Sequence, residues 1–95
     1  MATRLTITQE GRLYKSNSAT ITEGGKVCIQ AEFPGAKGYS RVDVLLRNSA
    51  EEGYVNIGSM DSKFGKPIMF EVNMYGGQQF VLQSSENFTA SYATE

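Results

Sequence analysis

The sequence contains no histidine, no tryptophan and one cysteine among its 95 residues. Without histidine, neither a Ser–His–Asp nor a Cys–His catalytic arrangement can be assembled, and zinc loses a common ligand. The one cysteine, Cys28, excludes an intrachain disulfide, and its place in the apolar run 27–29 indicates a small strand side chain. The composition therefore argues against the common nucleophilic enzymes and against zinc proteins.

Charge of one sign is not concentrated anywhere in the chain. Nine basic and ten acidic residues give a net charge of −1, and the two signs are interspersed. This balance offers no electrostatic reason to expect a nucleic acid or an anionic membrane as partner. Asp43 and Asp61 are the only aspartates, so no calcium loop can be built, and the pair Glu51-Glu52 is typical of a solvated loop. We therefore expect no catalytic residue, no metal and no cofactor, and a protein that is not an enzyme.

Long apolar runs are missing as well. No stretch of 18 apolar residues could span a membrane, and the first residues lead directly into an alternating segment without the apolar core of a signal peptide. We expect a protein without a signal peptide that is made in the cytoplasm. If it acts elsewhere, incorporation into a particle such as a virion would take it there.

What the sequence does contain is strand periodicity. A chain of 95 residues forms one domain, residues 1–95. Apolar residues recur at every second position between turn signals spaced by about ten residues, which favours an antiparallel β-sandwich. We predict about eight strands, connected as a jelly roll or as an immunoglobulin-like Greek key, with a small OB-like barrel as the alternative. The predicted strands cover residues 5–8, 12–15, 19–22, 27–33, 39–47, 54–58, 68–74, 79–83 and 88–92.

The segment Pro67–Tyr92 shows the clearest pattern. Residues 68, 70, 72 and 74 are apolar and alternate with other residues, and Gly76-Gly77 can adopt the positive φ of a tight hairpin turn. The pattern predicts a three-stranded meander over 68–92. Residues 59–66 are irregular and predict a long surface loop or a crossover between sheets. The predicted core comprises Phe33, Val42, Val44, Leu46, Ile57, Phe70, Val72, Phe80, Leu82 and Phe88.

Several apolar and aromatic residues fall on the face opposite this core. Strands that are apolar on both faces need cover on both sides, most simply from another copy of the chain. A loop packed over these residues would explain them equally well, tyrosines capping a small core are a further alternative, and exposed tyrosines can also stack on sugars. If the faces join in one sheet, the C-terminal segment is also the contact surface. The candidate interface residues are Leu45, Tyr54, Met69 and Tyr75.

One short motif resembles a nucleic-acid contact. Lys63-Phe64-Gly65-Lys66 places an aromatic ring between two lysines, as proteins that bind single strands do. The motif stands alone in a chain of near-zero net charge. A surface loop anchored by Phe64 is the favoured interpretation.

The C-terminal pattern, residues 80–85 followed by 88–93, resembles the last hairpin of small virion proteins of tailed bacteriophages. Strands rich in serine and threonine and a low charge add to the resemblance. It implies a small β-sandwich of the head-decoration or fibre-adaptor type, which forms symmetric oligomers, often trimers, and contacts other structural proteins. We therefore expect a structural or assembly module that acts as a homo-oligomer. The alternative is a β-sandwich that binds a glycan or a protein.

Overall fold

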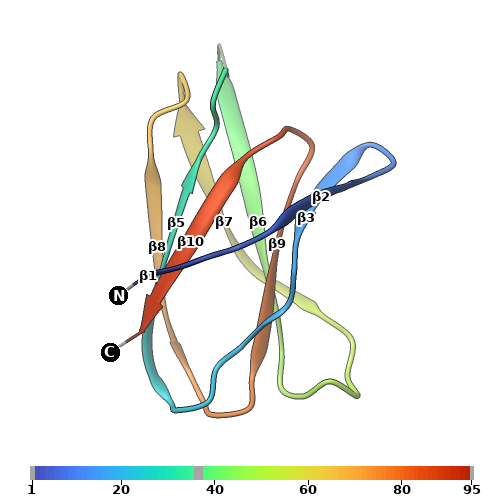
Figure 1. The fold of residues 1–95 in the computed structure, drawn as a ribbon, viewed down its shortest axis with the longest axis vertical. Coiled ribbons are helices and arrows are strands. Elements are labelled where there is room, and N and C mark those ends of the chain that lie inside the picture. Colours follow the sequence, from blue (N-terminus) through green and yellow to red (C-terminus); the bar gives the residue numbers. More distant parts are fainter. Residues whose placement is uncertain (1, 36–37, 95) are drawn as a thin grey trace.

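The computed structural model describes residues 2–35 and 38–94, and this part of the chain forms β-strands and no helix (Figure 1). Short polar turns rich in glycine, serine and asparagine separate the strands, and these frequent turns divide the chain into many short strands. In chain order the strands are β1 (Ala2–Arg4), β2 (Ile7–Glu10), β3 (Leu13–Ser16), β4 (Ala19–Thr20), β5 (Gly25–Glu32), β6 (Tyr39–Arg47), β7 (Val55–Lys63), β8 (Ile68–Met74), β9 (Gln79–Ser84) and β10 (Thr89–Thr94).

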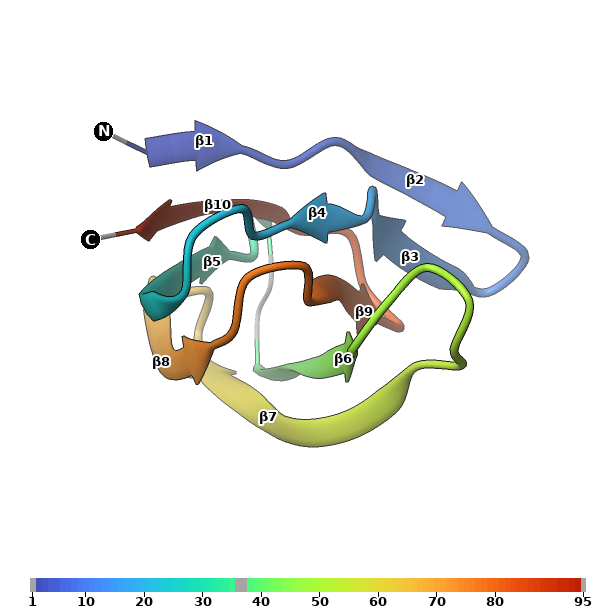
Figure 2. The same ribbon diagram turned by 90° about the horizontal axis from the view of Figure 1, so that it is seen from below.

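The strands form two antiparallel sheets. One has the order β1-β10-β5-β8; the other has the order β2-β3-β9-β6-β7, with β4 also paired to β9. Figure 2 views them from below, with β10, β5 and β8 on the left and β3, β9 and β6 to the right. Most connections cross from one sheet to the other, whereas β2 to β3, β3 to β4 and β6 to β7 stay within one sheet, and the resulting strand orders are those of the nested Greek keys of a jelly roll. The predicted sandwich is confirmed in its jelly-roll form, and the two separate sheets are not the OB-like barrel.

The predicted meander over 68–92 is wrong. Its three strands exist close to their predicted bounds, but β8 and β10 both pair with β5, whereas β9 lies in the other sheet. The connection through Gly76-Gly77 therefore crosses between sheets and closes no hairpin, although Gly77 does adopt a positive φ of 94°. The alternation of apolar residues specifies which side of a strand is buried, but it does not specify which strands are its neighbours in the sheet.

The predicted loop over 59–66 is also wrong, because β7 continues to Lys63. Met60 and Ser62 are buried on its core side, and the Ser62 hydroxyl donates a hydrogen bond of 2.7 Å to the Lys66 carbonyl. Gly58 occupies the same side, where a Cβ would lie 3.2 Å from the Phe70 ring. Because small and polar residues occupy the core face of β7, this strand lacks the alternation of apolar and polar residues from which the other strands were predicted.

The core lies between the sheets and contains most of the predicted residues. Ile57 is the error, with 39% of its surface exposed. The β6–β7 register shifts between Val44, opposite Gly58, and Leu45, opposite Asn56, so Ile57 is the extra residue of a bulge. Leu46, Phe70 and Val72 are half-buried around the core. The core residues are Leu5, Ala19, Ile21, Val27, Ile29, Ala31, Phe33, Val42, Val44, Met60, Met74, Phe80, Leu82, Phe88 and Ala90.

Candidate functional site

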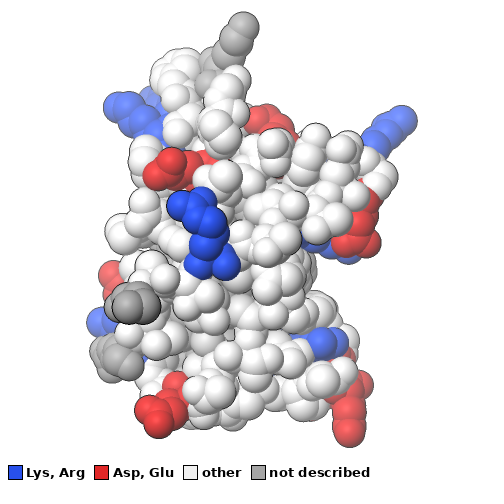
Figure 3. All heavy atoms as spheres, viewed as in Figure 1, with Lys and Arg blue, Asp and Glu red and all other residues white. Residues whose placement is uncertain are grey.

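The surface carries scattered charges. Figure 3 shows blue and red side chains dispersed over the front face with uncharged surface between them. The ion pairs found are exposed, such as Lys26 with Glu71 at 3.6 Å, and such pairs contribute little to stability. Candidate sites on this surface are therefore defined by exposed apolar and aromatic side chains.

The four candidate interface residues do not share a surface. Leu45 lies on β6 and Tyr54 just before β7, so both belong to the six-stranded sheet. Met69 lies on β8 and Tyr75 directly follows it, at the edge of the four-stranded sheet. The condition that their faces join in one sheet is not met, because β7 and β8 are consecutive in the chain but lie in different sheets.

Contacts within the chain occupy Tyr54. Its hydroxyl shares a hydrogen bond with the Ser18 hydroxyl, and the Arg47 guanidinium lies 4.3 Å from its ring centroid. Because Ser18 precedes β4 and Tyr54 precedes β7, the side chain reaches across the outward face of this sheet. Leu45 is half-buried there, and its cross-strand neighbour Val81 is only 9% exposed. The partial burial of Leu45 and Val81 within the chain favours the alternative in which a loop of the protein packs over the apolar side of β6.

Met69 and Tyr75 are exposed by 65% and 79%. Burial alternates along β8, so Met69, Glu71 and Asn73 face outward. Within residues 2–35 and 38–94, no strand pairs with β8 on the side away from β5, because β8 ends the four-stranded sheet, although β7 of the other sheet approaches it. Met69 and Tyr75 therefore flank an open sheet edge.

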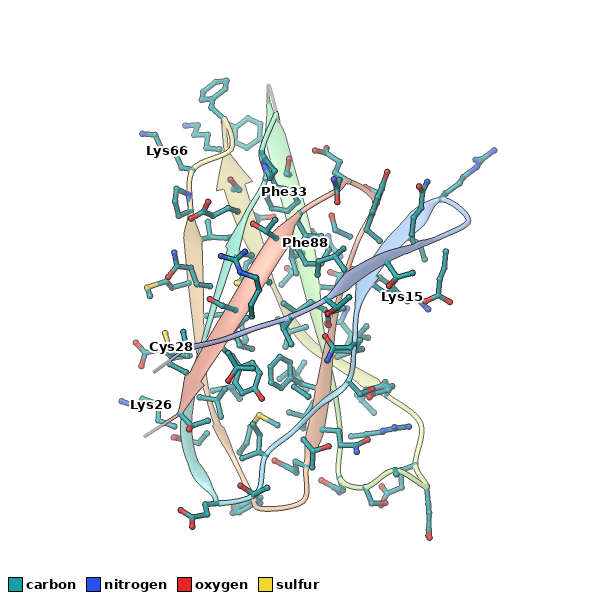
Figure 4. The ribbon with its side chains drawn as sticks, in the orientation of Figure 1. Lys15, Lys26, Cys28, Phe33, Lys66 and Phe88 are labelled. Carbon is teal, nitrogen blue, oxygen red and sulfur yellow. The ribbon has the colours of Figure 1, made fainter. Side chains whose placement is uncertain are left out.

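A second exposed cluster lies where β6 begins and β7 ends. Tyr39 is 73% exposed and Phe64 is 64% exposed, their ring centroids are 6.4 Å apart, and the Lys63 ammonium lies 5.5 Å from the Tyr39 centroid. Figure 4 places Lys66 at this end of the molecule. We call these four residues the aromatic tip. Phe64 lies on a surface turn, as predicted, but its side chain is exposed and does not anchor that turn, so this part of the prediction is wrong.

Backbone contacts hold the aromatic tip in place. The Phe64 amide donates to the Gly38 carbonyl at 2.9 Å, which links the two turns. Phe64 has a φ of 55°, which a bulky side chain rarely adopts. Tyr39 is not recognisable from the local sequence as part of this cluster, because 24 positions separate it from Lys63, its partner in the β6–β7 register. The glycines beside both rings, at positions 38 and 65, are the local signal of the two turns that meet here.

Cys28 is half-buried on the outward face of β5, opposite Glu71 of β8 (Figure 4). Across residues 2–35 and 38–94, no three side chains among histidine, cysteine, aspartate and glutamate are close enough to hold a metal ion. The same ranges contain no helix that is long and apolar enough to cross a membrane. No protein-family model matches the chain, and no curated protein matches it. The exposed edge β8 and the aromatic tip are therefore the two candidate sites on the described surface.

Proposed function

We propose that the protein is a non-enzymatic structural module that assembles with further copies of itself, in the setting of a phage virion. The jelly roll is a fold of viral capsid proteins, and it is also a fold of lectins, so the fold alone does not define the function. The resemblance of residues 80–93 to small phage virion proteins favours the first of these two classes. The observation that carries the proposal is the pair of exposed side chains, Met69 and Tyr75, on the open edge β8.

Met69 and Tyr75 leave apolar surface unburied. Complete burial of a methionine side chain is worth about 1.5–3 kcal/mol, and tyrosine is enriched at protein interfaces because its ring is apolar and its hydroxyl is wet. Single exposed apolar residues are ordinary, but here two of them flank a strand whose outer backbone groups have no partner strand in the described part of the chain. A further copy of the chain would cover both the two side chains and the outer backbone groups of β8.

Light scattering after size-exclusion chromatography tests the proposal. One chain has a mass of 10.4 kDa, and we expect an integer multiple of this mass at high protein concentration. Met69→Glu should shift the protein towards the monomer and leave its circular dichroism spectrum unchanged. Thr8→Glu is the matched control, since Thr8 is an exposed residue of β2 at an edge of the other sheet. A wild-type protein that remains a monomer at every concentration would contradict self-assembly.

A second candidate function is glycan binding at the aromatic tip. Two adjacent exposed rings with a lysine ammonium beside them offer a stacking surface together with a positive charge. This combination suits an acidic sugar, whose ring would lie on the aromatic faces and whose carboxylate would face Lys63 or Lys66. The fixed turn at Phe64 supports the candidate, because little ordering would accompany binding.

A glycan array would examine this candidate. Tyr39→Ala should abolish any binding, while Tyr75→Ala should preserve it, because Tyr75 is equally exposed but belongs to a different part of the surface. Equal loss in both variants, or no binding to any class of sugar, would exclude the tip as a glycan site.

A further inference from the structure

The four edges of the two sheets differ in how well they resist pairing with another strand. At one edge of each sheet the strand is short: β1 has three residues and β2 has four. The edge strand β7 has nine residues, but it contains the bulge at Ile57 and the charged residues Asp61 and Lys63. Shortness, bulges and charges are features that prevent edge-to-edge association.

The fourth edge, β8, lacks these features. Its seven residues pair with β5 in one unbroken register, and the strand contains no proline and no lysine. Glu71 is its one charged residue, and Lys26 of β5 lies 3.6 Å from it. β8 is therefore the edge best suited to accept another strand.

Side chains along this edge are arranged symmetrically about Val72. Met69 lies three positions before Val72 and Tyr75 three positions after it, with Glu71 and Asn73 next to it on either side. In an antiparallel pair of β8 strands whose two-fold axis passes through Val72, Met69 of each copy faces Tyr75 of the other. Glu71 then faces Asn73, and both outward faces remain on the same side.

Other registers are less favourable. A two-fold axis at Glu71 would place two carboxylates directly opposite each other, which is destabilising. An axis at Phe70 would leave Tyr75 beyond the paired segment. Tyr75 already uses its amide and carbonyl in hydrogen bonds with Gln78, so the backbone ladder ends at Met74 and Tyr75 contributes its ring.

We propose that two copies of this chain pair through β8 in an antiparallel manner about Val72, which joins their four-stranded sheets into one continuous sheet of eight strands. This proposal rests on the self-assembly proposed above and specifies its contact and symmetry. The interface is isologous, as in most closed dimers. A cross-strand row of outward side chains then continues across the contact, from Cys28 and Glu71 of one copy to Asn73 and Lys26 of the other.

Charge reversal with rescue tests the register. Met69→Glu and Tyr75→Lys, each made alone, should reduce the apparent dimerisation constant at least tenfold, because each leaves a charge against an apolar residue. The double variant should recover most of the loss, since it places opposite charges against each other twice in each dimer. Within one chain the two positions are roughly 20 Å apart along the strand, so rescue can arise only between copies.

Disulfide trapping gives an independent readout at exposed positions. In a Cys28→Ser background, an equal mixture of Glu71→Cys and Asn73→Cys chains should form the mixed disulfide dimer rapidly under oxidation. Glu71→Cys chains alone should form a disulfide-linked dimer only slowly. Replacing Cys28 prevents a bond within the chain, because Cys28 lies directly opposite Glu71.

The possible outcomes separate this inference from the broader proposal. A monomer at all concentrations contradicts both. An oligomer that tolerates Met69→Glu, or a mass three times 10.4 kDa, retains self-assembly and excludes pairing through β8. Rapid disulfide formation by Glu71→Cys chains alone shows that the axis passes through Glu71 and overturns the proposed register.

Discussion

Ser16→Ala probes a hydrogen bond that joins distant parts of the six-stranded sheet. Ser16 ends β3 and is buried, its hydroxyl accepts a hydrogen bond of 2.8 Å from the Leu82 amide, and it donates one of 3.0 Å to the Asn17 carbonyl. The pairing of β9 shifts by one residue between β3 and β4, and the Leu82 amide lies within this break. The serine hydroxyl therefore replaces a backbone acceptor.

The expected cost follows from leaving that amide without a partner. A buried donor that loses its acceptor costs about 1–3 kcal/mol, and we expect about 2 kcal/mol for Ser16→Ala. The whole domain is stabilised by about 5–14 kcal/mol at the usual value per residue. The loss should lower the melting temperature by roughly 10 °C, at about 4–8 °C for each kcal/mol in a domain of this size.

Urea denaturation followed by far-ultraviolet circular dichroism measures this loss, with both proteins at the same concentration because self-association would add to stability. Ser18→Ala is the matched control, since it removes an exposed hydroxyl two residues away that bonds to Tyr54. The control should change the unfolding free energy by no more than about 0.5 kcal/mol. If Ser16→Ala costs no more than Ser18→Ala, the bond to Leu82 does not stabilise the sheet as argued.

Two further substitutions test the packing. Gly76→Ala should lower the free energy of unfolding in urea by about 1–3 kcal/mol, because the new Cβ would lie 2.9 Å from the Thr22 carbonyl oxygen. Gly53→Ala is the control and should be nearly neutral, because nothing lies within 4 Å of its Cβ position. Equal effects of the two substitutions would contradict the predicted clash. Phe88→Ala should cost about 3–5 kcal/mol and leave the domain marginally folded by circular dichroism, since Phe88 is buried with its ring centroid 6.0 Å from that of Phe33 (Figure 4). A loss below about 1 kcal/mol would show that the core closes over the missing ring.

Local periodicity predicted most strands and their buried sides. The range 39–47 coincides with β6, and the prediction that Cys28 is a strand side chain is confirmed by its place in β5. The prediction failed on β7, where glycine and serine occupy core positions, and at Ile57, where the bulge changes the phase. Both failures have one cause: burial there depends on the neighbouring strand, which a local pattern does not contain.

For the candidate sites too, local patterns predicted some residues, whereas others depend on which strands pair. Met69 and Tyr75 were identified from the sequence because they alternate with core residues of one strand. Of the aromatic tip, the segment Lys63–Lys66 was singled out from the sequence but Tyr39 was not, because Tyr39 and Phe64 meet only when β6 and β7 pair over their full length. Tyr54 was assigned to an interface, but the pairing of β6 with β9 brings its ring towards Ser18, from a part of the chain 36 positions away.

For this protein, the sequence by itself determined the all-β class, the approximate strand bounds and the buried side of most strands, because these depend on residues two positions apart and on local turns. Only the tertiary structure decided which strands are neighbours and which lie at an edge. The pairings of β1 with β10, of β5 with β8 and of β9 with β6 join segments far apart in the chain, and they arise from closing one core between two sheets. That closure left β8 as an open edge with Met69 and Tyr75 exposed on it.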